Sequence, residues 1–181
     1  MIKKNYIFLI SSIAALGGLL FGFDTAVISG TTPFIKPYFN LDDIWLGWTV
    51  SSLLAGCIIG VISAGKPSDV FGRKKTMMAA AILFGLSAVG SALAHKLLFF
   101  IGYRIIGGFG VGIASMLVPM YISEVSPAAS RGRLVSFNQL AIVIGILLAF
   151  ISNAILVNSG ENNWRWMLAV MSLPAILFFI F

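Results

Sequence analysis

The sequence predicts an all-α membrane protein, a polytopic bundle of about six transmembrane helices. Of its 181 residues, 59% are hydrophobic and only 10% are charged, whereas a soluble domain carries about 25% charged residues. The mean hydropathy is +1.02. A chain of this composition lacks the polar surface that a water-soluble globule needs, and it is too apolar to be disordered. Its apolar residues fall in runs of about 20, the length that crosses the hydrocarbon core as a helix.

Three predicted spans occupy the first half of the chain. The first follows Lys3 and Lys4, and it is longer than the roughly 7–15 residues of a signal-peptide core, so we expect it to be retained. The segments after these spans carry turn signals: Pro33 and Pro37, then Lys66-Pro67, then His95-Lys96. The predicted ranges are Tyr6–Ser29, Ile44–Ala64 and Thr76–Ala94.

Three further spans follow, separated by Pro127 and by the polar segment from Asn158 to Asn163. Their predicted ranges are Leu97–Ile122, Leu134–Val157 and Trp166–Phe181. Helices are the economical structure for all six, because a helix satisfies its own backbone hydrogen bonds in lipid. The last run is still apolar at Phe181. We therefore expect residues 1–181 to form one N-terminal six-helix bundle, truncated within helix six.

The basic residues predict the orientation of these spans. The net charge is +6, but the bases fall between apolar stretches and do not form the single face that nucleic-acid binding requires. Because successive spans cross in opposite directions, the connecting segments alternate between two sides. The bases before the first span and after the second and fourth are Lys3, Lys4, Lys66, Arg73, Lys74, Lys75, Arg131 and Arg133. The bases after the first, third and fifth spans are Lys36, Lys96 and Arg165. Because Lys and Arg accumulate on the cytoplasmic side, we expect a multi-pass protein with a cytoplasmic N-terminus and the lipid bilayer around it.

Two ionisable residues lie inside predicted spans, where a charge indicates a function by default. Asp24 follows Tyr6 by 18 residues, about 27 Å along an outward-running helix at about 1.5 Å per residue. Arg104 follows Leu97 by seven residues, about 10 Å down an inward-running helix by the same rise. The two therefore share a depth in the outer half of the membrane, and we expect them to pair.

This pair has a functional and a static interpretation. Burial disfavours a charged carboxylate and a nearby guanidinium favours it, so separation of the two would let Asp24 take up a proton. Downhill proton movement supplies about 2.3 kcal/mol per 100 mV and could drive the uptake of a neutral solute. The alternative is an ion pair that only fixes the helix register. We favour the functional interpretation.

Small and amide residues are expected to hold the helices together. Glycines recur at four-residue spacing in the pairs Gly18/Gly22, Gly56/Gly60 and Gly108/Gly112, which allows close helix approach. Asn138 and Gln139 open the fifth span, and they either join helices or bind a polar ligand. The sequence has no Ser/His/Asp or Cys/His arrangement and no metal-ligand spacing, so it predicts neither an enzyme nor a metal or cofactor site. A single cysteine, Cys57, excludes an intrachain disulfide.

Five segments carry a resemblance to a known family. They are residues 17–30 (Gly-Gly-Leu-Leu-Phe-Gly-Phe-Asp-Thr-Ala-Val-Ile-Ser-Gly), Gly65-x-x-x-Asp69-x-x-Gly72-Arg73-Lys74, Arg104-Ile-Ile-Gly-Gly-Phe-Gly-Val-Gly, Pro119-Met-Tyr-Ile-Ser-Glu124 with Arg131-Gly132, and Ser136-Phe-Asn-Gln139. Together they resemble the first helix, the loop between helices two and three, the fourth helix, the next cytoplasmic loop and the fifth helix of the sugar porters. These porters are a branch of the major facilitator superfamily.

The resemblance implies roles for these residues. Asp24 matches the proton-coupling aspartate and Arg104 the arginine that modulates it, with the proton as coupling ion and no other cofactor. Gln139 matches a sugar-binding glutamine, and Phe21 matches an aromatic residue of the sugar cavity. The cytoplasmic gating network of the family is matched by Asp69, Gly72, Arg73, Lys74, Glu124 and Arg131.

The family resemblance predicts a proton-coupled transporter of a pentose or hexose, such as D-xylose, that works by alternating access. Ile146 departs from the pattern, because xylose-transporting members have a second sugar-contacting glutamine there. The family has twelve helices, so a C-terminal half is expected as the missing partner. Two alternatives stay open. One is an inactive truncated membrane fragment, and the other is a facilitative sugar or polyol carrier, although such carriers tend to have Asn at the Asp24 position.

Overall fold

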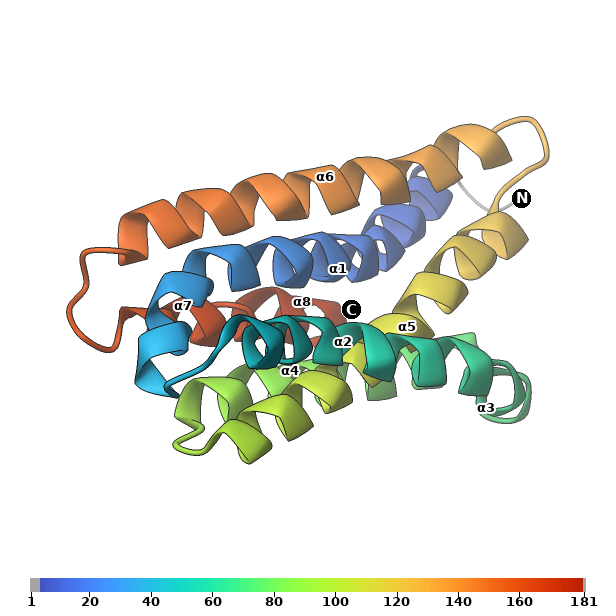
Figure 1. The fold of residues 1–181 in the computed structure, drawn as a ribbon. Helices are drawn as coiled ribbons and strands as arrows, with labels where there is room; N and C mark the ends of the chain where they lie inside the picture. The colour runs from blue at the N-terminus through green and yellow to red at the C-terminus, as the bar shows by residue number, and fades with distance from the viewer. Residues whose placement is uncertain (1–3, 181) are drawn as a thin grey trace.

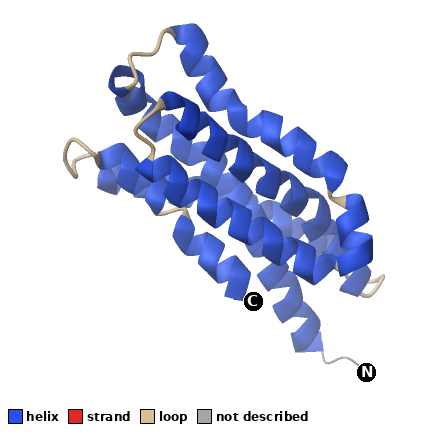
Figure 2. Cartoon of the chain, turned by 90° about the horizontal axis from the view of Figure 1, so that it is seen from below, coloured by secondary structure: helices blue, strands red, loops and turns tan. Residues whose placement is uncertain are grey.

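The computed structural model describes residues 4–180, with side-chain surroundings from residue 15 onward. This part of the chain consists of helices joined by short turns and contains no strand (Figure 2). Six stretches are long and apolar enough to cross a membrane, which confirms the predicted fold class. The helices are α1 (Lys4–Tyr38), α2 (Asp43–Ser63), α3 (Gly65–Phe71), α4 (Arg73–Leu93), α5 (Leu97–Val125), α6 (Arg131–Leu156), α7 (Asn163–Ala169) and α8 (Ser172–Ile180).

Helix α1 is longer than predicted, because it continues through Pro33 and Pro37 to Tyr38. The prediction that these prolines mark a connecting segment is therefore wrong. Both proline rings lie on exposed positions of the helix. The turn that follows Tyr38 includes Asn40, which has a φ of 51°, a left-handed conformation that asparagine tolerates just beyond helix ends.

The sixth span also differs from its prediction, because it begins at Asn163 and is broken into α7 and α8. Pro174 supplies a reason for the break. It has no N–H to donate to the carbonyl of Val170, and it disfavours a helical conformation at Leu173. Met171 and Leu173 instead make shorter i to i−3 bonds, with N···O distances of 3.1 and 3.0 Å.

Helix α5 crosses the bundle diagonally and packs against α1, α2, α4 and α6 (Figure 1). Its contact with α2 depends on glycine. Gly56 and Gly60 of α2 face Gly108 and Gly112 of α5, and a Cβ on any of these four would lie 1.9–2.3 Å from a carbonyl oxygen of the other helix. The predicted role of these glycine pairs in close helix packing is confirmed.

Helices α1 and α6 lie side by side along much of their length (Figure 1). A Cβ on Gly22 would lie 2.0 Å from the carbonyl oxygen of Ile142, so the two backbones touch. Further along, the Nδ2 of Asn153 donates a hydrogen bond of 3.2 Å to the carbonyl oxygen of Val27. This amide is a joint between α1 and α6 that the sequence analysis did not single out.

The connecting segments lie at two opposite ends of the bundle (Figure 1). One end holds α3 and the turn between α5 and α6, and it gathers Lys66, Arg73, Lys74, Lys75, Arg131 and Arg133. The other end holds the turns that follow α1, α4 and α6, with Lys36, Lys96 and Arg165. The described bases therefore divide as predicted. Lys3 lies outside the described residues.

Candidate functional site

Asp24 and Arg104 form an ion pair in the centre of the bundle. Asp24 lies on α1 and Arg104 on α5, and the Arg104 Nη1 donates to the Asp24 Oδ1 at 2.5 Å. Each residue is only 1% exposed. The contact that the helix-rise arithmetic predicts is confirmed, although these residues are 80 positions apart.

The pair is incompletely satisfied. Among the described residues, neither the Asp24 Oδ2 nor the Arg104 Nε has a hydrogen-bond partner. A buried polar atom without a partner costs free energy, so a fully static ion pair would be expected to saturate both groups. Within the described residues, one oxygen of the Asp24 carboxylate is thus left without a protein partner.

The predicted sugar-site residues lie on the two helices that pack side by side. Phe21 is half-buried on α1 and packs against the core. Gln139 lies on α6, is exposed, and forms no hydrogen bond among the described residues. The contact of Gly22 with Ile142 shows that the two predicted residues lie at similar heights along the bundle. Their role in sugar binding stays a prediction.

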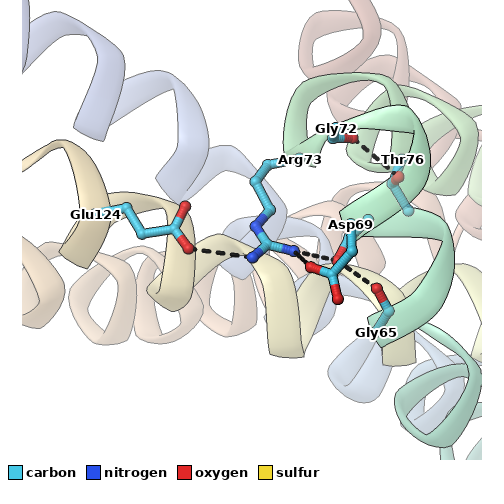
Figure 3. A network of polar contacts seen from close by, with 7 residues as sticks. Gly65, Asp69, Gly72, Arg73, Thr76 and Glu124 are labelled. Carbon is cyan, nitrogen blue, oxygen red and sulfur yellow. Dashed lines mark hydrogen bonds and ion pairs between the residues drawn. The ribbon is translucent and has the colours of Figure 1, made fainter.

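A second polar cluster lies at the end of the bundle that holds α3 (Figure 3). The Arg73 Nη1 pairs with the Asp69 Oδ1 at 2.6 Å, and the Nη2 pairs with the Glu124 Oε1 at 3.3 Å. We call Asp69, Arg73 and Glu124 the charge cluster. Arg73 also donates to the hydroxyl of Ser68, which the sequence analysis missed. Arg73 therefore ties α3 and α4 to the end of α5.

Gly72 makes the turn that presents Arg73 to its partners. Its φ is 89°, a conformation that residues with a Cβ rarely adopt. Its carbonyl oxygen accepts hydrogen bonds from the Thr76 amide at 3.2 Å and the Thr76 hydroxyl at 3.0 Å, which begins α4 (Figure 3).

The structure does not bring every residue of the predicted gating network together. Lys74 and Arg131 are exposed, and neither forms an ion pair within the described part of the chain. Arg131 lies in the first turn of α6, across the turn that follows Glu124. The contacts in this structure thus join the charge cluster and Ser68, and the gating roles of Lys74 and Arg131 stay predictions.

The fold and these sites define a class of protein: a membrane-spanning helical bundle with a buried carboxylate–guanidinium pair. Comparison with known proteins narrows that class. The model of the family described as "Sugar (and other) transporter" matches residues 10–181. The chain therefore belongs to this sugar transporter family.

Similar relatives include transporters of three sugars. The chain is 46% identical to the glucose transport protein of Synechocystis sp. over 96% of its own length and 40% of the relative's length. It is 46% identical to the D-xylose-proton symporter of Escherichia coli K12, with coverage of 97% and 42%. It is 43% identical to the arabinose-proton symporter of Bacillus subtilis, with coverage of 98% and 40%. The chain thus spans about two fifths of the length of these relatives.

Solved structures of the major facilitator superfamily share the fold. The proton:xylose symporter XylE bound to 6-bromo-6-deoxy-D-glucose matches with a TM-score of 0.93 and 45% identity, over 98% of this chain and 44% of that one. The inward-open structure of the Escherichia coli xylose transporter XylE matches with a TM-score of 0.91 and 46% identity, with coverage of 97% and 47%.

Proposed function

We propose that this chain is the proton-coupling part of a sugar–proton symporter, with Asp24 as the proton site and Arg104 as the group that controls it. The observation that carries the proposal is the buried pair itself, because its Asp24 Oδ2 and Arg104 Nε have no partner among the described residues. When Arg104 moves away, the buried carboxylate loses its counter-charge and takes up a proton. When the pair re-forms, the proton is released.

The similarity to two states of one transporter supports this mechanism. The chain matches the ligand-bound and the inward-open XylE structures with TM-scores of 0.93 and 0.91, as expected if this bundle moves largely as one body. Alternating access then arises from rocking of the bundle against a second one around a site between them. A sugar at that interface would be bound by Gln139 and Phe21 from this side, and we propose a pentose or hexose.

The charge cluster supports a gating role at the end of the bundle that we propose to be cytoplasmic. It holds α3, α4 and α5 together through one guanidinium. Breaking and re-forming such ion pairs is a common element of switching transitions. We propose that the N-terminus of this multi-pass protein lies on the same, cytoplasmic side of a bacterial inner membrane.

The test uses a chimera in which this chain replaces the matching part of the Escherichia coli D-xylose-proton symporter, reconstituted in proteoliposomes. Sugar-driven proton uptake is followed with an internal pH dye, and exchange of labelled sugar is measured separately. We expect the chimera to accumulate sugar, and its Asp24→Asn variant to lose accumulation while it retains exchange. Unaltered accumulation by that variant would exclude Asp24 as the proton site.

The same experiment separates the alternatives. Exchange without proton uptake in the unsubstituted chimera would indicate a facilitative carrier. The chain reconstituted by itself supplies a further arm. Sugar-driven proton uptake there would show that one bundle is sufficient, and its absence beside an active chimera would show that the second bundle is required.

A further inference from the structure

At the end of the bundle opposite the charge cluster, Arg165 is a cation without a carboxylate partner. It is half-buried at the third position of α7, and no ion pair joins it to any described acid. Its Nη1 donates to the Ala92 carbonyl oxygen at 2.6 Å and its Nη2 to the Tyr38 hydroxyl at 2.8 Å. Because a guanidinium has five N–H donors, these two bonds leave donors and a full positive charge for another ligand.

Aromatic rings hold this guanidinium in place. Its carbon lies 4.5 Å from the ring centroid of Trp164 and 5.3 Å from that of Tyr38. Stacking on two rings restricts the side chain, so little conformational freedom is lost when it binds an anion. The described acids at this end of the bundle form no ion pair with it. Asp43 pairs with Lys36 at 2.7 Å, the Asp42 Oδ1 accepts from the Trp45 amide, and Glu161 is exposed in the turn before α7.

Arg165 lines a cavity of about 520 Å³ between the ends of α1, α4 and α7. Its polar lining also includes His95 and Asn162, and its apolar walls are formed by Leu93, Trp166 and Ala169. None of its lining residues is acidic. This combination suits an amphiphile with a negatively charged head, because the cationic and amide groups lie beside large apolar surfaces.

An apolar stripe leads away from the cavity along α4. Leu93, Val89, Leu86 and Ile82 are 46–64% exposed, and their spacing of three and four residues places them on one face of the helix. Trp166 is 60% exposed beside the cavity, and tryptophan is enriched at membrane–water interfaces. Trp166 therefore favours a position of the cavity at the level of the lipid headgroups, with the stripe reaching toward the hydrocarbon core.

We propose that this cavity binds the phosphate of an anionic membrane phospholipid through Arg165, with an acyl chain along the α4 stripe. The phosphate oxygens accept the free guanidinium N–H groups, and His95 and Asn162 contact the headgroup. The lipid site is distinct from the Asp24–Arg104 pair. The proposal of lipid binding is therefore independent of the proposed transport function. In the orientation predicted from the basic residues, the lipid belongs to the outer leaflet.

The experiment measures lipid occupancy by native mass spectrometry of the full chain in neutral detergent. Dioleoyl phosphatidylglycerol is titrated against dioleoyl phosphatidylcholine, and inorganic phosphate and glycerol 3-phosphate serve as soluble arms. We expect preferential binding of phosphatidylglycerol, with occupancy reduced about tenfold or more by Arg165→Gln, because charge-assisted bonds to phosphate are lost. Binding of the soluble phosphates with no added affinity for the lipid would overturn the proposal of a lipid site.

Matched variants separate a site from general charge attraction. Arg133→Gln removes an exposed base at the opposite end and should leave occupancy unchanged. If circular dichroism shows that Arg165→Gln does not fold, Leu93→Asn serves as the test of the lipid site. Leu93 is 64% exposed, so its replacement removes only lipid contact and should also reduce occupancy. Unchanged occupancy in Arg165→Gln or Leu93→Asn, or equal loss in Arg133→Gln, would refute the proposal.

Discussion

Removing either partner of the buried pair should destabilise the bundle far more than removing both. Asp24→Asn leaves the Arg104 guanidinium 1% exposed with no carboxylate within reach, and a guanidinium cannot give up its proton. Stranding one partner of a buried pair costs about 3–5 kcal/mol. Since about 1.4 kcal/mol is tenfold, this is a change of roughly a hundredfold to several thousandfold in the unfolding equilibrium.

The reverse substitution should cost less. Arg104→Met leaves the Asp24 carboxyl, which can take up a proton and lose its charge, so its penalty should shrink as the pH is lowered. The double variant Asp24→Asn/Arg104→Met strands no charge and should recover most of the loss, because apolar or neutral replacement of a whole buried pair is often close to neutral.

The assay is reversible unfolding of the purified chain in mixed detergent and dodecyl sulfate micelles, followed by circular dichroism. Lys36→Gln is the control, because its ion pair with Asp43 is exposed at both side chains (45% and 89%) and such pairs contribute little. Single substitutions that each cost under about 1 kcal/mol, or a double variant whose cost is the sum of the two, would refute the reasoning.

Three further substitutions test the packing and the charge cluster. Gly108→Ala should lower the free energy of unfolding by about 1–3 kcal/mol in the same assay, because its Cβ would lie 1.9 Å from a carbonyl oxygen of α2. Gly102→Ala on the same helix is the control. A Cβ there would meet no atom within 4 Å, so this substitution should be neutral or stabilising. Gly72→Ala should cost about 1–3 kcal/mol through its φ of 89°, and an unchanged unfolding midpoint would contradict this. Glu124→Gln should speed hydrogen exchange of the α3 and first α4 amides, while Lys74→Gln, which removes an exposed base without an ion pair, should not.

The sequence predicts the buried pair because depth in a membrane follows from residue count. A helix rises by a fixed distance per residue, so two intramembrane charges on antiparallel spans can be compared directly. Asp24 and Arg104 indeed meet at 2.5 Å. Helix number and approximate position were predictable for the same reason, since apolar runs of sufficient length must be helical in lipid.

The ends of the helices were less predictable, because a proline can lie inside a continuous helix or next to a helix break. Pro33 lies inside α1, whereas Pro174 follows a break between α7 and α8. Sequence alone does not show whether neighbouring contacts compensate for the lost N–H. Asn153 belongs to no recognised motif. A lone amide within an apolar span is nevertheless a signal for an interhelical hydrogen bond, and Asn153 makes such a bond to the Val27 carbonyl oxygen.

The packing of this bundle restricts where a coupling movement can occur. Backbone-to-backbone contact at Gly56, Gly60, Gly108 and Gly112 joins α2 to α5, and the same kind of contact joins α1 to α6. Close-packed backbones cannot slide without opening voids, so protonation of Asp24 is not expected to separate these helices from one another. If Asp24 is the proton site proposed above, its change of charge can act through the Arg104 side chain, which is long and has an unpartnered Nε among the described residues, and at the α1–α5 interface that the pair spans. On that proposal, proton binding between tightly packed pairs of helices would alter how this bundle sits against a neighbouring one, as alternating access requires.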